Sequence, residues 1–341
     1  GILERGSKTG SFSYLLWPSR IGAFTTVLGK HYINFDTSLL PFSYINEEEG
    51  KSFITPAMNM LTAGTRRDGL KWPKRDRRKA AEKYDLINFD VLSPYTVSKM
   101  SAAAGLLRTL YENTPKETEN VNYQGILIKR LLLKTSARFY EMGIKIFIGS
   151  CVAEKLNDLG DPFLWEDAIS ALSSDTSEDT GKWTDIAGLL APEADISLLV
   201  KKIEELEISD LSGVLLNLQE MFGAYNRNKW NWCASLIEKR FNIRISEITP
   251  AILEDILSGW KTNLIRLNNM IIQDAEKEFD PVSKIGYGID GDSTVKDCDF
   301  SSVRGSAGSN SFIAELKREN QETEKQYERL AGLLGYSVSS M

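Results

Sequence analysis

The chain has 341 residues, 42% of them apolar, and a formal net charge of −6 at neutral pH. This composition predicts a globular protein of two or three domains, and the negative charge argues against nucleic acid or an anionic membrane as a partner. Three widely separated cysteines match no metal-binding or redox spacing, and a single histidine excludes a multi-histidine zinc site. We therefore expect a cytoplasmic protein with no metal site and no membrane span.

A six-residue repeat organises the first 37 residues. One position of each hexad is aliphatic in all but one case, and it is occupied by Leu3, Thr9, Leu15, Ile21, Val27 and Ile33. The position four residues later is small and hydroxylated in all but one case, and it is occupied by Ser7, Ser13, Ser19, Thr25, His31 and Thr37. A period of six predicts a β-solenoid in which each hexad is one short strand and one turn. We expect Leu15, Ile21 and Val27 to fill the lumen, and an ordinary β-meander is the alternative.

Two of the hexads resemble the signature of left-handed β-helix proteins, the hexapeptide-repeat transferase superfamily. They are Leu3-Glu4-Arg5-Gly6-Ser7-Lys8 and Ile21-Gly22-Ala23-Phe24-Thr25-Thr26. The resemblance implies three hexads per coil, so the five hexads from Leu3 to Tyr32 make fewer than two coils. A solenoid needs about three stacked coils to cover its core. We therefore expect residues 1–50 to be the terminal coils of a left-handed β-helix. We also expect the chain to be the C-terminal part of a longer hexapeptide-repeat protein.

A dense basic segment, Arg66 to Lys79, lies within residues 51–92, which we expect to form an irregular connector. It holds eight Lys or Arg against two Asp, a local charge of +6, and Gly69, Trp72 and Pro73 argue against a single helix. Guanidinium groups bind phosphate or carboxylate in pairs, and an indole stacks on a base or a sugar. The candidate ligand-binding residues are Arg66, Arg67, Lys71, Trp72, Lys74 and Arg75. The alternative is a solvated segment that pairs with acidic helices of the same chain.

Helical signals dominate residues 93–341, which we expect to form a helical bundle, so the predicted fold class is α+β. Ser93-Pro94 and Thr249-Pro250 each combine an N-cap with a proline at the first helical position. Apolar periodicity predicts helices over residues 93–112, 123–156, 163–172, 196–206, 211–241, 250–279 and 311–334.

Residues 283–310 are expected to form an irregular loop within this domain. Its glycine string, Gly286-Tyr287-Gly288-Ile289-Asp290-Gly291, matches a dinucleotide-binding pattern but lacks the preceding strand and the following helix that such a site needs. Arg304, near the end of the loop, is a further candidate for an anion site.

Several strings also resemble an uncharacterised family of bacterial hexapeptide-repeat proteins with a helical C-terminal region. They are Asp36-Thr37-Ser38, Leu40-Pro41-Phe42-Ser43-Tyr44, Lys71-Trp72-Pro73-Lys74-Arg75-Asp76, the glycine string and Val303-Arg304-Gly305. The resemblance covers most of the chain and implies no established activity, because a shared fold does not fix a function.

His31 is the only histidine, and it lies in the repeat. The resemblance to β-helix acyltransferases implies that it acts as a general base, at a groove between the subunits of a trimer. An imidazole suits this role because its pKa lies near neutrality. Asp36 is near enough in the sequence to orient the ring. The alternative is that His31, in the small-residue position, only ends the stacking of hexads.

Three functions remain open at this point. The first is acyl transfer to a sugar or sugar nucleotide, with His31 as the base and the basic segment holding a phosphate. The second is a non-catalytic module that binds an anionic small molecule: a sugar phosphate, a nucleotide sugar or acyl-CoA. The third is an oligomerisation scaffold in which the solenoid trimerises. No cofactor is assigned, and a homo-oligomer, such as a trimer, is expected in all three cases.

Overall fold

The computed structural model describes residues 1–80, 84–173 and 180–335, and its mixture of helices and strands confirms the α+β class. The strands are β1 (Ile2–Leu3), β2 (Lys8–Thr9), β3 (Tyr14–Leu15), β4 (Arg20–Ile21), β5 (Thr26–Val27), β6 (Lys30–His31), β7 (Tyr44–Glu48), β8 (Lys51–Thr55), β9 (Asn120–Tyr123), β10 (Ile126–Lys129), β11 (Trp183–Ile186) and β12 (Leu189–Pro192).

The α-helices are α1 (Ala63–Arg75), α2 (Pro94–Asn113), α3 (Arg130–Asn157), α4 (Trp165–Ser173), α5 (Glu193–Glu204), α6 (Leu211–Gly223), α7 (Tyr225–Phe241), α8 (Pro250–Glu276), α9 (Ser293–Arg304) and α10 (Ser311–Leu333). Short 3-10 helices are η1 (Met58–Leu61), η2 (Ile245–Glu247), η3 (Lys277–Phe279), η4 (Pro281–Lys284) and η5 (Ala307–Ser309). None of these helices, within the described residues, is long and apolar enough to cross a membrane.

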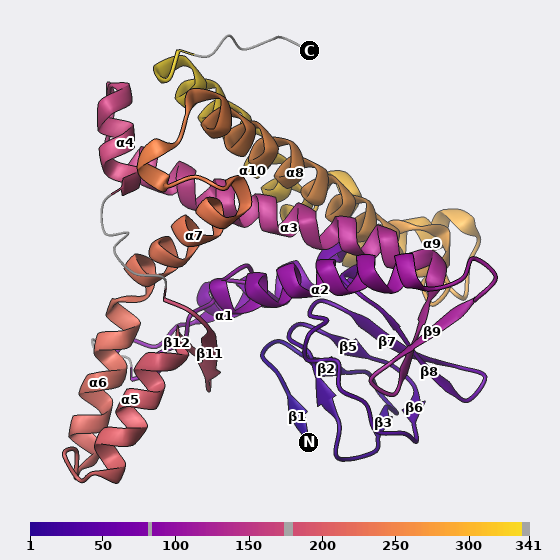
Figure 1. Cartoon of the computed structure of the whole chain (residues 1–341). Coiled ribbons are helices and arrows are strands. Elements are labelled where there is room, and N and C mark those ends of the chain that lie inside the picture. Colours follow the sequence, from indigo (N-terminus) through magenta and orange to yellow (C-terminus); the bar gives the residue numbers. More distant parts are fainter. Residues whose placement is uncertain (81–83, 174–179, 336–341) are drawn as a thin grey trace.

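These elements stack in layers (Figure 1). The strands of the N-terminal segment lie against α2, α3 packs on α2, and α8 and then α10 follow on the far side of α3. The helices α5 and α6 extend away from this stack, and we call the pair the arm (Figure 1). The arm is therefore a part of the molecule that projects from the stacked layers.

The first strands pair in parallel, three of the four pairings at the same spacing, and we call residues 1–45 the coil. Ile2 pairs with Arg20, Lys8 with Thr26, and the pairing continues from Thr26 to Tyr44. Each of these pairs is 18 residues apart, which is three hexads. The side chains of Ile21 and Val27 are fully buried, as the repeat predicts, while Leu15 is half-buried against the core.

One corner of the coil shows how aromatic residues replace glycine in the repeat. Gly6, Phe24 and Phe42 occupy equivalent positions, and all three have positive φ angles, of 67°, 54° and 56°. The Phe24 ring lies where a β-carbon on Gly6 would be, 2.3 Å from its Cδ1 atom, and it stacks on the Phe42 ring with centroids 5.0 Å apart. Ring stacking over glycine offsets the strain of the left-handed backbone at the two phenylalanines.

The predicted six-residue register is wrong beyond Val27. Leu15 pairs with His31, a spacing of 16 residues, because this side of the coil is two residues shorter. His31 therefore takes the position equivalent to Leu15 instead of the small-residue position, and Ile33, in the aliphatic position of the repeat, is 46% exposed. A polar ring thus enters the interior of the coil.

The long helix predicted over residues 123–156 begins later than expected. Residues 120–129 form the β9–β10 hairpin, and β10 joins β8, so that the main sheet has the order β2-β5-β7-β8-β10-β9. Gln124 and Gly125 at the tip both have positive φ angles, as a type I′ turn requires. The helix α3 starts at Arg130, immediately after the hairpin. A second hairpin, β11–β12, turns in the same way at Ala187 and Gly188.

The expectation of an irregular connector over residues 51–92 is also wrong in part. It contains the strand β8 and the helix α1, which includes both Gly69 and Pro73. Thr62 caps α1, and the Ala63 amide donates to the Asp274 carboxylate of α8 at 3.0 Å. These tertiary contacts outweigh the low helix propensity of glycine and proline.

Two other differences concern helix boundaries. The predicted helix over residues 211–241 is interrupted at Ala224, which separates α6 from α7. The predicted loop 283–310 contains α9, whose N-cap Asp292 follows the glycine string directly, so a helix does start there. The string is nevertheless preceded by the 3-10 helix η4 and not by a strand, so the dinucleotide context is still absent.

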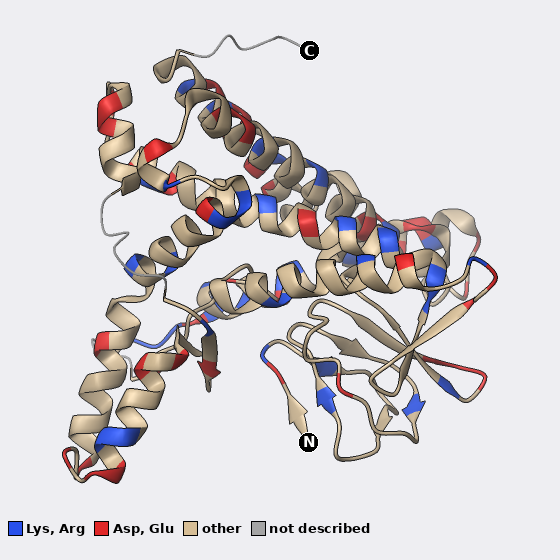
Figure 2. Ribbon diagram, viewed as in Figure 1, with Lys and Arg blue, Asp and Glu red and all other residues tan. Residues whose placement is uncertain are grey.

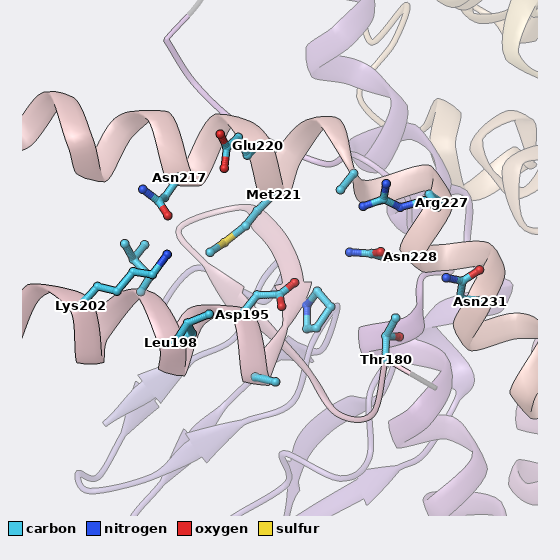
Figure 3. Close-up of a pocket in the computed structure, with 14 residues that line it drawn as sticks. Thr180, Asp195, Leu198, Lys202, Asn217, Glu220, Met221, Arg227, Asn228 and Asn231 are labelled. Atoms are coloured by element: carbon cyan, nitrogen blue, oxygen red, sulfur yellow. The ribbon is translucent and has the colours of Figure 1, made fainter. Parts of the chain in front are cut away.

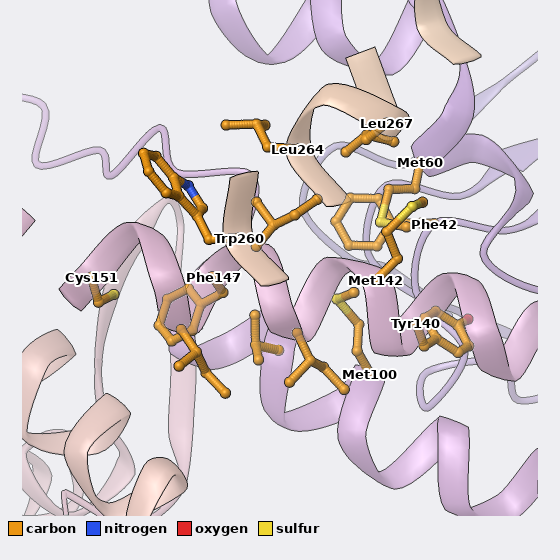
Figure 4. Close-up of a cluster of buried hydrophobic side chains, with 14 of the residues drawn as sticks. Phe42, Met60, Met100, Tyr140, Met142, Phe147, Cys151, Trp260, Leu264 and Leu267 are labelled. Carbon is orange, nitrogen blue, oxygen red and sulfur yellow. The ribbon is translucent and has the colours of Figure 1, made fainter. Parts of the chain in front are cut away.

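The core lies between α2, α3 and α8 and continues into the coil at Phe42 (Figure 4). Met100, Tyr140, Phe147 and Trp260 are buried there, and α3 has buried residues along most of its length, from Leu133 to Leu156. The Tyr140 hydroxyl donates to the Pro41 carbonyl at 2.7 Å, which joins α3 to the coil. The coil and the helices therefore share one hydrophobic core.

Candidate anion-binding site

The basic segment is held against acidic side chains of two other helical elements. Arg66 donates to both oxygens of Glu319 at 2.7 and 2.8 Å, and Lys74 donates to both oxygens of Glu315 at 2.6 and 2.7 Å. Arg67 forms an ion pair with Glu278. For these three cations, the alternative that the segment pairs with acidic helices of the same chain is confirmed.

The helices α1 and α10 border a groove of about 540 Å³, which we call the α1–α10 groove. The lining residues are Gly64, Arg67, Asp68, Leu70, Lys71, Lys74 and Arg75 of α1 with Ser311, Phe312 and Glu315 of α10. Four cations and two carboxylates give this lining a formal charge of +2. The wider helical surface shows Lys and Arg interspersed with Asp and Glu (Figure 2), so a lining with excess positive charge is a local feature.

Lys71 and Arg75 are the two cations of the groove that remain open. They are four residues apart on α1, so they lie on the same face of the helix. Both side chains are exposed, and neither forms an ion pair or hydrogen bond within the described residues. Together they offer a phosphate both the planar guanidinium of Arg75 and the ammonium of Lys71.

The walls of the groove are fixed by contacts to other elements. The Arg67 guanidinium lies over the Phe312 ring, 4.6 Å from its centroid, in addition to its ion pair with Glu278. Asp68 accepts from Lys8 of β2 at 2.9 Å, which ties the groove to the coil. The shape of the groove therefore depends on the coil, on α10 and on η3.

Trp72 and Arg304 are not brought into the groove. Trp72 is 50% exposed and does not line it, and the Arg78 guanidinium lies 5.9 Å from the centre of its ring. Arg304, the last residue of α9, donates through Nε to the Tyr287 hydroxyl at 3.0 Å. That hydrogen bond raises the pKa of Arg304, and the charge of Glu278 adds to the effect.

The structure places His31 in the interior of the coil. Its ring has no exposed surface and packs edge-on against Phe35. Nε2 lies 3.1 Å from the Leu28 carbonyl, which can only accept, so Nε2 carries the proton and the Ser52 hydroxyl donates to Nδ1 at 2.8 Å. Burial lowers the pKa of His31, so the ring is held neutral.

Asp36 does not contact His31. Its carboxylate accepts from the Ser38 amide at 2.8 Å, and its own amide donates to the Gln124 carbonyl of the β9–β10 turn. In the acyl-transfer hypothesis, Asp36 would bond to Nδ1 of His31. Ser52 bonds to that nitrogen instead. The arrangement leaves neither nitrogen of His31 open to a substrate.

The sequence did not point to the α10 side of the groove. Ser311, Phe312 and Glu315 lie about 240 residues from α1 in the chain, and no local pattern links them to it. The usable signal is the spacing of Glu315 and Glu319, which puts two carboxylates on one face of an acidic helix. That signal predicts a basic neighbour but does not say which one.

Two family models match parts of the chain. Residues 1–111 match a domain of unknown function (DUF4954), and residues 164–333 match another domain of unknown function (DUF6819). Comparison with curated proteins and with solved structures gives no match. The helix α1 lies in the first matched region and α10 in the second, so the groove forms where the two regions meet.

Proposed function

We propose that the chain is a non-catalytic binding module, built on coils of a left-handed β-helix, that holds a phosphorylated small molecule in the α1–α10 groove. A sugar phosphate, a nucleotide sugar or acyl-CoA belongs to this class. The observation that carries the proposal is the pair Lys71 and Arg75, two exposed cations without partners in the described part of the chain. They lie in a groove of formal charge +2, in a chain of net charge −6.

The size and field of the groove support this ligand class. A volume of about 540 Å³ lies within the roughly 300–1,000 Å³ range of small-molecule sites. The first turn of α10, at Ser311 and Phe312, borders the groove, and the positive end of the helix dipole adds to the attraction for an anion. Arg67 and Lys74 are already paired, so a ligand phosphate would bind chiefly to Lys71 and Arg75.

The β-helix part of the proposal is supported by the strand pairing of the coil. Parallel pairs 18 residues apart, with Ile21 and Val27 buried, fit three hexads per coil. Acyl transfer, which the same resemblance implies, receives less support because His31 is buried with both nitrogens bonded. The three cysteines are unpaired, which supports a reducing, cytoplasmic setting.

Isothermal titration calorimetry with pyrophosphate, UDP-N-acetylglucosamine and acetyl-CoA tests the proposal. We expect at least one of these probes to bind, and the double variant Lys71→Glu/Arg75→Glu to lose at least tenfold in affinity. The matched control is Lys116→Glu/Lys325→Glu, which makes the same change in net charge at exposed lysines outside the groove. No binding by any probe, or an equal loss in both variants, would refute the proposal.

Self-association of the coil is the second candidate function. Large aromatic side chains are exposed on the coil: Phe12 is 90% exposed, and Tyr14, Trp17 and Tyr32 are also at the surface. Exposed apolar patches of this kind mark interaction surfaces. We expect light scattering to give the mass of a trimer, and Phe12→Ser/Tyr32→Ser to shift it to that of a monomer. A wild-type monomer at all concentrations would exclude this role.

A further inference from the structure

A second cavity, larger than the α1–α10 groove, lies where the arm meets α7 (Figure 3). Its volume is about 700 Å³, and we call it the arm cavity. Its polar lining includes Asp195 and Lys202 of α5, Glu220 of α6, and Arg227, Asn228 and Asn231 of α7. In Figure 3, the labelled side chains from the three helices surround one space. The whole cavity belongs to the second matched region, residues 164–333.

Six of the eight polar side chains that line the arm cavity have no partner among the described residues, while Thr180 accepts from Trp183 and Asn217 donates to the Gly213 carbonyl. Asp195, Lys202, Glu220, Arg227 and Asn228 form no side-chain hydrogen bond or ion pair with any residue that the structure describes. The side-chain oxygen of Asn231 is buried and also has no partner. Buried polar atoms in native proteins are nearly always satisfied, so the Asn231 oxygen indicates a group that a ligand satisfies. The other five side chains are half-buried or exposed and are open to the same ligand.

The charges of the arm cavity select against a strong anion. Asp195 and Glu220 balance Lys202 and Arg227, so the lining has no formal net charge. Burial raises the pKa of Asp195, while the charge of Arg227 acts in the opposite direction. The field of this site therefore differs from that of the α1–α10 groove, whose lining is positive.

The chemistry of the lining suits hydroxyl groups. A sugar hydroxyl both donates and accepts, and each asparagine amide does the same, while carboxylates accept and Lys and Arg donate. Leu199 and Met221 line the same cavity and offer an apolar surface for the C–H face of a ring. Volumes of several hundred Å³ hold small ligands of this size.

We infer that the arm cavity is a binding site for a neutral carbohydrate of one or two rings. The hydroxyls pair with Asp195, Glu220 and Asn228, and Lys202 and Arg227 donate from the two ends of the cavity. Charged sugar phosphates fall outside this class because the lining, with no formal net charge, offers them no excess of cations. The site is independent of the α1–α10 groove and of the ligand proposed there.

Saturation-transfer NMR with glucose, N-acetylglucosamine and maltose tests this inference on the full chain. We expect at least one of the three sugars to bind, and Asn228→Leu to weaken its binding at least tenfold. Asn226→Leu is the matched control, because Asn226 lies on the same helix, is exposed and does not line the cavity. Binding to Asn226→Leu should stay within twofold of wild type.

Glu220→Gln gives a second measurement that does not depend on filling the cavity. Glu220 is exposed at its rim, so this variant keeps the fold, and thermal unfolding checks that it does. We expect it to lose at least threefold in sugar affinity while pyrophosphate binding at the α1–α10 groove is unchanged. The inference is overturned if no sugar binds at 50 mM, if Asn226→Leu and Asn228→Leu lose binding equally, or if Glu220→Gln binds as wild type.

Discussion

The coil and the arm cavity differ in whether their polar side chains have hydrogen-bond partners within the chain. Inside the coil, the Phe24 carbonyl and Thr26 accept from Asn59 of η1, and both nitrogens of His31 are bonded, although Arg5 Nε is buried without a hydrogen-bond partner. In the arm cavity, six polar side chains face one space without a partner among the residues that the structure describes. Satisfied buried networks specify a fold, whereas open polar groups are available to a ligand. Substitutions in the coil should therefore change stability, and those in the arm should change binding.

The largest effect is expected at the buried ion pair between the coil and α2. Glu4 is nearly fully buried, and it pairs with Arg20 at 3.0 Å and with Lys99 of α2. Burial lowers the pKa of Lys99, and the charge of Glu4 opposes this effect. Glu4→Ala leaves the Lys99 charge buried without compensation, so we expect the free energy of unfolding to fall by about 3 kcal/mol. Urea unfolding followed by circular dichroism measures this change.

The matched substitution in the arm is Glu220→Ala. This carboxylate is exposed and has no partner among the described residues, so the free energy of unfolding should stay within about 0.5 kcal/mol of wild type. If the two alanine variants were destabilised equally, the contrast between coil and arm would be false.

Tyr140→Phe removes one hydrogen bond between the helices and the coil. The ring is fully buried, and its hydroxyl donates to the Pro41 carbonyl. We expect a loss of about 1.5 kcal/mol, because a buried acceptor is left without its partner while the packing is kept. Tyr14→Phe, at an exposed ring of the coil, is the control and should change nothing measurable. Equal unfolding midpoints for both variants would show that the Tyr140 hydroxyl adds no stability.

The sequence predicted those parts of the fold that a local signal specifies. The hexads place Ile21 and Val27 correctly in the interior, since a six-residue period needs no partner to be recognised. Ser93 and Thr249 mark the starts of α2 and α8, because an N-cap followed by proline acts within one turn. The shortened side of the coil after Val27 has no such signal, and so the position of His31 could not be foreseen.

The features that the sequence missed depend on distant contacts. The helix α1 forms despite Gly69 and Pro73, because Glu315 and Glu319 of α10 hold its cations. The turns at residues 124–125 and 187–188 place Gln and Ala at positive φ angles, where Asn or Asp is the usual signal. The arm cavity combines side chains from three helices, none of which shows a motif by itself.

A smaller effect, of about 1 kcal/mol, is expected for His31→Leu at pH 7.5. Leucine suits the interior position, because Leu15 occupies the equivalent position on the paired strand. The substitution nevertheless leaves the Ser52 hydroxyl and the Leu28 carbonyl without their partner. Chemical unfolding of the variant and the wild type measures the difference.

The pH dependence of the same variant tests whether His31 is held neutral. Burial lowers its folded-state pKa below the unfolded value of about 6.5, so the unfolded state binds more protons between these values. The stability that this group contributes is fully present above pH 6.5 and is lost as the pH falls toward the folded-state pKa. We expect wild type to lose more stability than His31→Leu between pH 7.5 and pH 5.5. Parallel losses would mean that the ring is not shielded from protons.

The smallest change in stability, and the sharpest contrast with the coil, is expected for Asp195→Asn. Burial raises the pKa of Asp195, so its charge is disfavoured in the folded state, and neutralising it is favourable at pH 7. Asp195 also lies in the first turn of α5, where a negative charge is favourable to the helix. These effects oppose each other, so the free energy of unfolding should change by less than about 0.5 kcal/mol.

Carbohydrate binding should nevertheless fall at least fivefold in Asp195→Asn, because the amide nitrogen replaces an acceptor with a donor in the arm cavity. Saturation-transfer NMR and thermal unfolding on the same sample measure both quantities. Normal sugar binding with reduced stability would assign Asp195 to the fold, as Glu4 is in the coil. Reduced binding with unchanged stability places it with the groups that the chain leaves open for a ligand.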